Sequence, residues 1–172
     1  MAVGIAQAAW SRRGVLLGAG AALAGCDGFP RDSGGALERI RRERRVRVGA
    51  VDHAPWVRLA GGAVDGLEAG LVRAWAATLG AAVGWRAGAL DPLSEALHGR
   101  ELDLLIAGFD EKTPYAPKLA LTQPYLSARV DGRRTKRVLA VQPGENALLM
   151  SLDTFLLAQE EAALRRRAGA AA

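Results

Sequence analysis

The sequence predicts an α/β fold built on a mainly parallel sheet, because strand-like and helix-like segments alternate along the chain. Strand-like apolar runs occur at 46–51, 81–85 and 102–108, and helical patterns separate them. Strands that alternate with helices form right-handed crossovers, which make the sheet parallel and cover both of its faces. Once a leader and a spacer are subtracted, roughly 135 residues remain, a size that suits one domain with one core.

The first strand, 46–51, follows a short charged helix and ends at the turn-like residues 52–55. The clearest helix spans 66–79, where apolar side chains recur at helical spacing. These side chains are Leu67, Leu71, Val72, Trp75 and Leu79. Gly80 stands where a helix C-cap glycine belongs, so we expect the helix to end there.

The second strand is predicted at 81–85, and a further helix is predicted at 91–98. We expect Asp91 to be the N-cap of that helix, with Pro92 at its first position. The run 102–108 is almost entirely apolar, as is typical of a strand buried on both faces. Trp75 and Trp85 are interpreted as core residues.

The first 25 residues have the pattern of a signal peptide. The pair Arg12-Arg13 precedes an uncharged apolar run, and the pair resembles the twin-arginine export signal. Leu23-Ala24-Gly25-Cys26 resembles a lipobox, so we expect lipidation of Cys26, the only cysteine. The alternatives are a buried Cys26 or a membrane span, for which the run from Gly14 to Gly25 is shorter than the ~20 residues required.

These features divide the chain into a signal peptide at 1–25, a lipidated spacer at 26–35, an α/β domain at 36–160 and a flexible basic and Ala-rich tail at 161–172. We expect the mature protein on the periplasmic face of a bacterial membrane. Asp27 resembles a signal that retains lipoproteins in the inner membrane, which favours that membrane. A single cysteine defines no disulfide framework.

The charge of the chain does not favour a nucleic-acid partner. Removal of the leader, which contains Arg12, Arg13 and no acidic residue, lowers the formal charge from +5 to +3. The basic clusters at 39–47 and 165–167 contain no aromatic residue that could stack on bases. Attraction to anionic lipid headgroups beside the anchor is a better interpretation of these clusters.

In open α/β sheets, ligands bind outside the carboxyl ends of the strands. The candidate binding residues are therefore those that follow the first and third strands: Asp52, His53, Trp56, Gly108, Asp110, Thr113 and Tyr115. Trp56 could stack on a planar or cationic group or pack at the rim of a helix. His53 could bind a ligand or be an exposed loop histidine. Asp110 could bind an amine or cap the turn at Lys112 and Thr113.

The order of these motifs resembles the family 3 extracellular solute-binding proteins, the polar amino acid receptors of ABC transporters. The resemblance rests on the segments 37–51, 54–56, 66–80, 97–104 and 121–125, and it resumes at 137–157. It implies one lobe of a type II periplasmic binding protein, a small polar solute such as an amino acid as ligand, and an ABC permease or another membrane protein as partner.

The family places a whole second lobe between its two hinge strands. Here only about a dozen residues separate these strands, which is too few for a lobe. Asp131-Gly132 is a strong two-residue hairpin signal between those strands, so we expect them to be joined as a hairpin. With one lobe, roughly half of the ligand hydrogen bonds would be lost, each worth ~1 kcal/mol. Binding should then be weaker by several powers of ten.

The chain also departs from the family's ligand site. The family has an arginine that clamps the ligand carboxylate, and in this sequence Tyr115 falls at that position. Lys112 is a possible substitute cation or a solvated loop lysine, and Gly70 stands where the family usually has an aspartate. No Ser/His/Asp set is convincing, since His53 and the distant His98 are the two histidines, and the lone cysteine is assigned to lipidation, so we expect neither an enzyme nor a cofactor. A membrane-bound interaction scaffold and a truncated receptor fragment remain as alternatives to a binding protein.

Overall fold

The computed structural model describes residues 34–130 and 132–169. All of these residues belong to the unit Arg31–Ala172. Residues 1–33 lie outside the described part of the chain, and with them the predicted signal peptide, Cys26 and most of the spacer.

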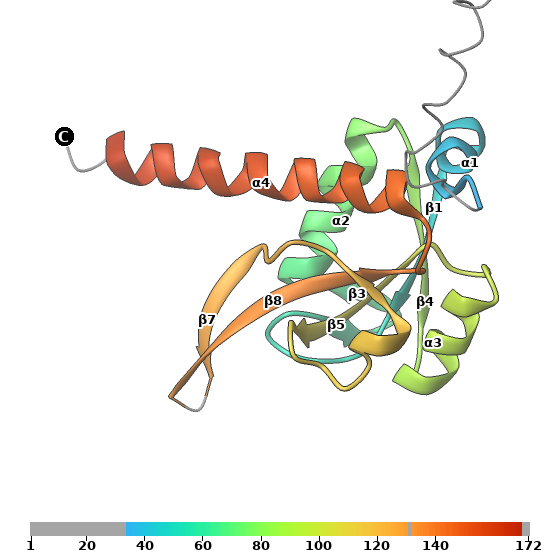
Figure 1. Ribbon diagram of the computed structural model, residues 1–172, viewed down its shortest axis with the longest axis horizontal. Helices are drawn as coiled ribbons and strands as arrows, with labels where there is room; N and C mark the ends of the chain where they lie inside the picture. Colours follow the sequence, from blue (N-terminus) through green and yellow to red (C-terminus); the bar gives the residue numbers. More distant parts are fainter. Residues whose placement is uncertain (1–33, 131, 170–172) are drawn as a thin grey trace, which may run out of the picture. The chain divides into compact units, whose positions relative to one another are not determined.

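A six-stranded sheet forms the centre of this unit, with the strand order β4-β1-β5-β8-β6 and with β7 paired to β8 (Figure 1). β1 pairs in parallel with both β4 and β5, whereas β8 runs antiparallel to β5, β6 and β7. The bounds are β1 Arg45–Ala50, β4 Ala82–Ala87, β5 Leu104–Asp110, β6 Ala120–Leu121, β7 Leu126–Val130 and β8 Arg133–Val141. A separate antiparallel pair is formed by β2 Arg58–Ala60 and β3 Ala63–Asp65.

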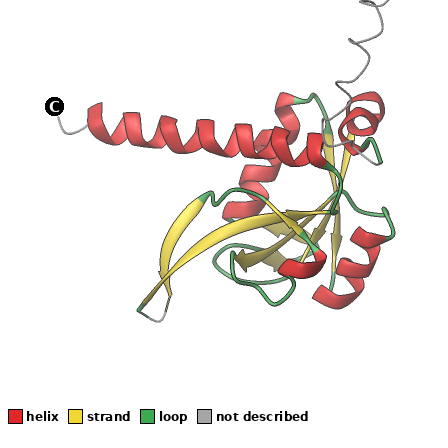
Figure 2. Ribbon diagram, viewed as in Figure 1, coloured by secondary structure: helices red, strands yellow, loops and turns green. Residues whose placement is uncertain are grey.

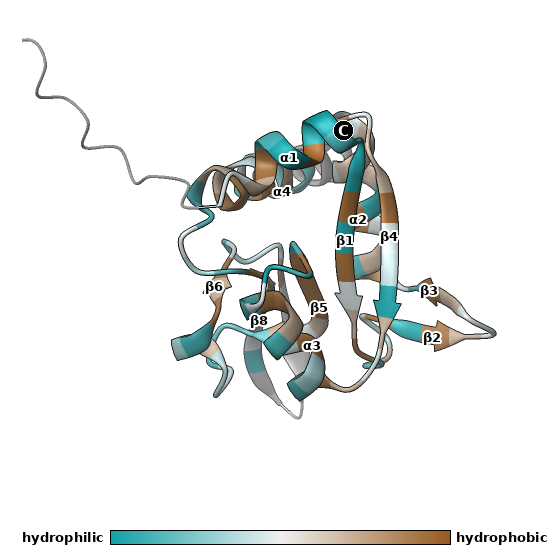
Figure 3. Cartoon of the chain, turned by 90° about the vertical axis from the view of Figure 1, so that its right-hand side faces the viewer, coloured by the Kyte–Doolittle hydropathy of each residue, from teal (hydrophilic) through white to brown (hydrophobic). Residues whose placement is uncertain are grey.

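Helices pack on both sides of the sheet (Figure 2). Their bounds are α1 Ala36–Glu43, α2 Leu67–Thr78, α3 Leu90–His98 and α4 Asn146–Gly169, with a short 3-10 helix, η1, at Ala116–Lys118. Buried side chains of α1, α2 and α4 share one apolar cluster with β1 and β5. Buried side chains of α3 share a second cluster with β5 and β8. The apolar stretches of β1 and β5 are visible in Figure 3.

The predicted fold class is confirmed. The three predicted strands correspond to β1, β4 and β5, with ends that differ by one or two residues, and the predicted helix at 66–79 corresponds to α2. Gly80 has the left-handed φ of +62° expected after a helix. Trp75 is a core residue, only 1% exposed. Trp85 is half-buried, and the guanidinium carbon of Arg73 lies 5.4 Å from its ring centroid.

The predicted cap of α3 is wrong. The helix begins at Leu90, two residues before the predicted first position Pro92, with Ala89 as its N-cap and no side-chain cap hydrogen bond. Asp91 lies within the first turn, where its carboxylate Oδ1 accepts a hydrogen bond from the Tyr115 hydroxyl at 2.7 Å. The Asp91 carboxylate, which the sequence predicted to cap the helix, thus binds the side chain of Tyr115 from another part of the chain.

The hairpin expected at residues 131–132 is present as β7 and β8. Val130 pairs with Arg133 across a two-residue connection, and Gly132 has a φ of +76°, which a tight hairpin turn requires. At the other end of β8, the chain enters α4, which continues to Gly169. The end of this helix therefore does not coincide with the boundary at residue 160, beyond which we expected a flexible tail.

Candidate functional site

A cavity of about 420 Å³ opens at the carboxyl ends of β1 and β5. We call it the cleft. Its walls are formed by Val51 and His53 after β1, by the last residues of β5 with the loop that follows, and by Arg137 of β8. This is the edge of the sheet at which ligands of open α/β folds bind.

His53 and Gly108 fix the backbone at the base of the cleft. The ring nitrogen Nδ1 of His53 lies 2.7 Å from the carbonyl oxygen of Ala107, so it carries the proton and donates this hydrogen bond. Gly108 has a left-handed φ of +61°, and a Cβ placed on it would lie 2.8 Å from Cδ1 of Trp56 and 2.9 Å from Nδ1 of His53. A glycine is therefore required for β5 to end this close to the turn after β1.

A buried carboxylate, Glu68, supports the same backbone from beneath. Glu68 is fully buried in the first turn of α2, accepting one hydrogen bond from the Gly108 amide at 3.0 Å and another from the Tyr125 hydroxyl. Burial raises the pKa of the Glu68 carboxyl, although these hydrogen bonds and nearby His53 act in the opposite direction. Burial and the neighbouring Glu68 also raise the pKa of Tyr125.

The loop after β5 forms the rim of the cleft. Asp110 caps its turn, since its Oδ1 accepts the Lys112 amide hydrogen bond at 2.9 Å. The Tyr115 hydroxyl donates a hydrogen bond to the Asp91 carboxylate of α3, and this hydrogen bond raises the pKa of Tyr115. Lys112 is exposed at the rim.

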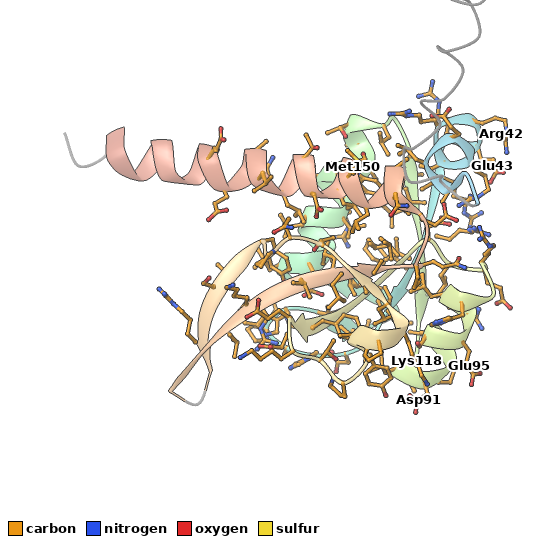
Figure 4. The ribbon with its side chains drawn as sticks, in the orientation of Figure 1. Arg42, Glu43, Asp91, Glu95, Lys118 and Met150 are labelled. Atoms are coloured by element: carbon orange, nitrogen blue, oxygen red, sulfur yellow. The ribbon has the colours of Figure 1, made fainter. Side chains whose placement is uncertain are left out.

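A second cavity lies on the far side of Tyr115, between α3 and η1. Asp91 and Glu95 of α3 and Lys118 of η1 are among its lining residues, and Figure 4 labels all three. Its lining combines exposed charged side chains of both signs with the exposed His98, the half-buried Tyr115 and the buried Ser94. We therefore place the candidate site in the cleft, whose base is ordered by buried hydrogen bonds.

Arg137 is the cleft residue that the sequence interpretation missed. It is 6% exposed, its Nη1 donates to the carbonyl oxygen of Gly108, and its guanidinium carbon lies 4.9 Å from the centroid of the Trp56 ring. Its Nε is buried and has no hydrogen-bond partner. The sequence signal was slight: Arg137 is the last cation before the apolar run of β8, Val138 to Val141.

The structure brings most of the predicted site residues together. The cleft is lined by His53, Gly108, Asp110, Thr113 and Tyr115. Asp52 is exposed, and its Oδ1 accepts the Leu59 amide hydrogen bond at 3.1 Å, so it holds the turn that leads into β2. Trp56 is half-buried against the core, with the Arg137 guanidinium over its ring.

Among the described residues, no group of three or more His, Cys, Asp and Glu side chains could hold a metal ion. Within the same part of the chain, no helix combines the length and apolar character that a membrane span needs.

Neither a scan against family models nor a search of curated proteins found a match. Solved structures do match. Domain 1 of the arginine-binding protein TmArgBP, in its arginine-bound form, has a TM-score of 0.62 at 22% identity, over 69% of this chain and 95% of that one. An arginine-bound truncated form of the arginine-binding protein from T. maritima has a TM-score of 0.63 at 13% identity, over 71% and 99%.

A further match is an ancestral cationic amino acid solute-binding protein, with a TM-score of 0.67 at 13% identity, over 76% of this chain and 96% of that one. Another structure of this ancestral protein is described as a precursor of cyclohexadienyl dehydratase. These neighbours are mainly binding proteins, and the match to an isolated domain 1 spans nearly all of that domain. The described part of this chain therefore has the fold of a single lobe of an amino acid solute-binding protein.

Proposed function

We propose that this chain is a membrane-anchored solute-binding protein related to the amino acid receptors of ABC transporters, and that it binds a small polar solute such as an amino acid in the cleft. The observation that carries the proposal is the cleft itself, at the carboxyl ends of β1 and β5 in a fold shared with amino acid-binding lobes. The anchor is the lipid on Cys26, and a permease or another membrane protein is the partner.

Two features of the cleft support a polar solute. Its size of about 420 Å³ falls within the range of small-molecule sites. Its walls combine apolar side chains with a few polar ones, which are His53, Asp110, Lys112, Thr113, Tyr115 and Arg137. The solved domain 1 of the arginine-binding protein is arginine-bound as a separate domain, which supports ligand binding by one lobe here.

Binding should be weak. A ligand in a one-sided cleft keeps part of its surface in water, and each hydrogen bond that a second lobe would add is worth about 1 kcal/mol. We therefore expect dissociation constants in the millimolar range, about −4 kcal/mol of binding free energy. A low-affinity receptor of this kind depends on high local concentration at the membrane.

The test is a titration of the full chain, labelled with ¹⁵N, against a panel of L-amino acids at millimolar concentration. We expect chemical shift changes at the backbone amides of Gly108, Asp110 and Thr113. The amides of Ala36 and Arg47, which belong to the opposite end of the sheet, serve as the internal control. Unchanged spectra for the whole panel, from a folded and monomeric sample, would refute the proposal.

A further inference from the structure

The buried cation in the cleft has no carboxylate partner. Among the ion pairs that the described residues form, none includes Arg137, although the chain contains many Arg and Lys side chains paired with Asp or Glu. Buried charges are normally paired, because an unpaired ion loses its hydration without compensation. Buried nitrogens normally have an acceptor too, yet the Nε of Arg137 has none.

The protein compensates this charge only in part. The ring of Trp56 lies over the guanidinium, which is a cation–π contact. The carbonyl oxygen of Gly108 accepts one N–H. The buried Glu68 accepts the amide hydrogen bond of the same Gly108 but forms no ion pair with Arg137 among the described contacts, and burial raises its pKa, which favours its neutral form. The cleft thus retains positive charge and a free donor beside Trp56.

A carboxylate, that of Asp110, lies on the strand next to Arg137. Asp110 and Arg137 are direct partners in the antiparallel pairing of β5 and β8, and both line the cleft. Directly paired residues project to the same side of a sheet, with Cβ atoms about 5 Å apart. The two side chains nevertheless form no ion pair with each other among the described contacts, and Asp110 instead accepts the Lys112 amide.

We propose that Arg137 and Asp110 hold the head group of an α-amino acid, with the ligand carboxylate on the guanidinium and the ligand ammonium on Asp110. This inference rests on the proposed function, and it deepens it by naming the groups that recognise the ligand. A zwitterion presents one charge of each sign on adjacent atoms, so it complements two opposite charges on neighbouring strands.

The same arrangement selects against other anions. A phosphate or a dicarboxylate brings excess negative charge close to Asp110, and the like charges repel. An amine without a carboxylate leaves the guanidinium unpaired. Because the Arg137 guanidinium lies over the Trp56 ring, we expect a carboxylate that binds the guanidinium to change the surroundings of the ring, and the indole N–H resonance of Trp56 should report this change.

The experiment is a ¹⁵N titration of the full wild-type chain with three forms of each probe. The probes are L-arginine, L-glutamine and L-alanine, each as the free amino acid, as the amide without the carboxylate, and as the N-acetyl acid without the ammonium. We expect the free amino acid to bind at least tenfold more tightly than either derivative, and to shift the indole resonance of Trp56. This comparison requires no variant.

Two variants assign the preferences to residues. Arg137→Met keeps most of the apolar stem and should abolish the preference for the acid over the amide, whereas Arg137→Lys, which keeps the charge, should retain part of it. Asp110→Asn should abolish the preference for the free amine over the N-acetyl form. Arg134→Met changes an exposed arginine of the same strand and is the matched control, with the preferences of the wild type.

The outcomes separate the two proposals. If amino acids bind but their amides bind equally well, or if Arg137→Met weakens acid and amide alike, the head-group assignment is overturned and the binding function stands. If no form of any probe binds to the folded wild-type chain, the binding function itself fails. Unchanged preferences in the folded Arg137→Lys and Asp110→Asn variants also overturn the assignment.

Discussion

At the scale of single residues, Glu68 couples the core to the cleft. Its carboxylate is fully buried and accepts a hydrogen bond from the backbone amide of Gly108. The carbonyl oxygen of Gly108 accepts a hydrogen bond from the Arg137 side chain. Removing a carboxylate from water disfavours its charged form, and the pKa of Glu68 is raised for this reason first of all. The base of the cleft is thus organised by a group whose charge depends on pH.

The first prediction concerns the pH dependence that Glu68 causes. Its pKa in the folded state lies above its ordinary value of 4.5, so its contribution to stability is complete below pH 4.5 and is lost as the pH rises through the folded pKa. Glu68→Gln is uncharged at every pH. Urea unfolding from pH 4.5 to neutral pH should therefore give a flatter dependence of the unfolding free energy on pH in the variant than in the wild type.

Partial burial also raises the pKa of the Asp153 carboxyl. Asp153 is present in both the wild type and the variant, so the difference between the two curves isolates Glu68. Two parallel curves would contradict the prediction. They would mean that the carboxylate is compensated in the folded state as fully as in water, through Tyr125 and Gly108.

The residue scale is also where sequence reasoning about the site was least complete. The positions after β1 and β5 were predictable, because the α/β pattern places ligands at those strand ends. Arg137 was not, because its role depends on the pairing of β8 with β5, and four cations among the five residues 133–137 at a hairpin usually indicate a solvated edge. Asp52 was assigned to the site by position alone; it is not among the residues that line the cleft, and its carboxylate accepts the Leu59 amide hydrogen bond.

At the scale of elements, a buried aspartate joins α1, β1 and the start of β5 at the end of the sheet opposite the cleft. Asp103 is 3% exposed, and it accepts hydrogen bonds from the amide of Arg47 at 2.8 Å, from the Arg47 side chain at 2.7 Å and from Arg39. Its own amide donates to the carbonyl oxygen of Arg47. These contacts set the register between the helix and the two parallel strands.

The second prediction is that Asp103→Asn lowers the unfolding free energy by about 2–3 kcal/mol, because two arginines lose a charged acceptor in a partly buried site. Glu101→Gln is the matched control. Glu101 pairs with Arg86 at 2.7 Å, but both side chains are more than half exposed, so its loss should cost under about 1 kcal/mol. Equal losses of stability in urea unfolding would show that burial does not strengthen the Asp103 cluster.

The elements themselves were largely predictable, since β1, α2, β4 and β5 each carry a strong apolar period or run. The two exceptions have different causes. Asp91 was assigned as a helix cap from its neighbours in sequence, but Tyr115, distant in sequence, takes its carboxylate. The extent of α4 to Gly169 was likewise missed, because Ala-rich and Arg-rich sequence is compatible with both helix and tail.

At the scale of the whole molecule, the proposed weak binding and the predicted lipid anchor would support each other. We expect a lobe with a one-sided cleft to bind its ligand weakly and to release it quickly, since most affinity differences among related complexes appear in the off-rate. Such a lobe is useful only where a partner or a high ligand flux is close by. A lipid on Cys26 would hold the lobe within the length of its spacer from the membrane, which raises the effective concentration of a membrane partner.

The final prediction is that Cys26→Ser abolishes this attachment while it leaves the lobe folded. In bacterial cells, the wild-type chain should incorporate labelled palmitate and sediment with the membranes, because multiple acyl chains give stable anchoring where one chain does not. The variant should incorporate no label and leave the membrane fraction in a salt wash. Arg12→Lys with Arg13→Lys should instead retain the chain in the cytoplasm if export uses the twin-arginine pair. A Cys26→Ser chain that still sediments with salt-washed membranes would assign the attachment to another part of the protein, with the basic segment at 39–47 as the first region to examine.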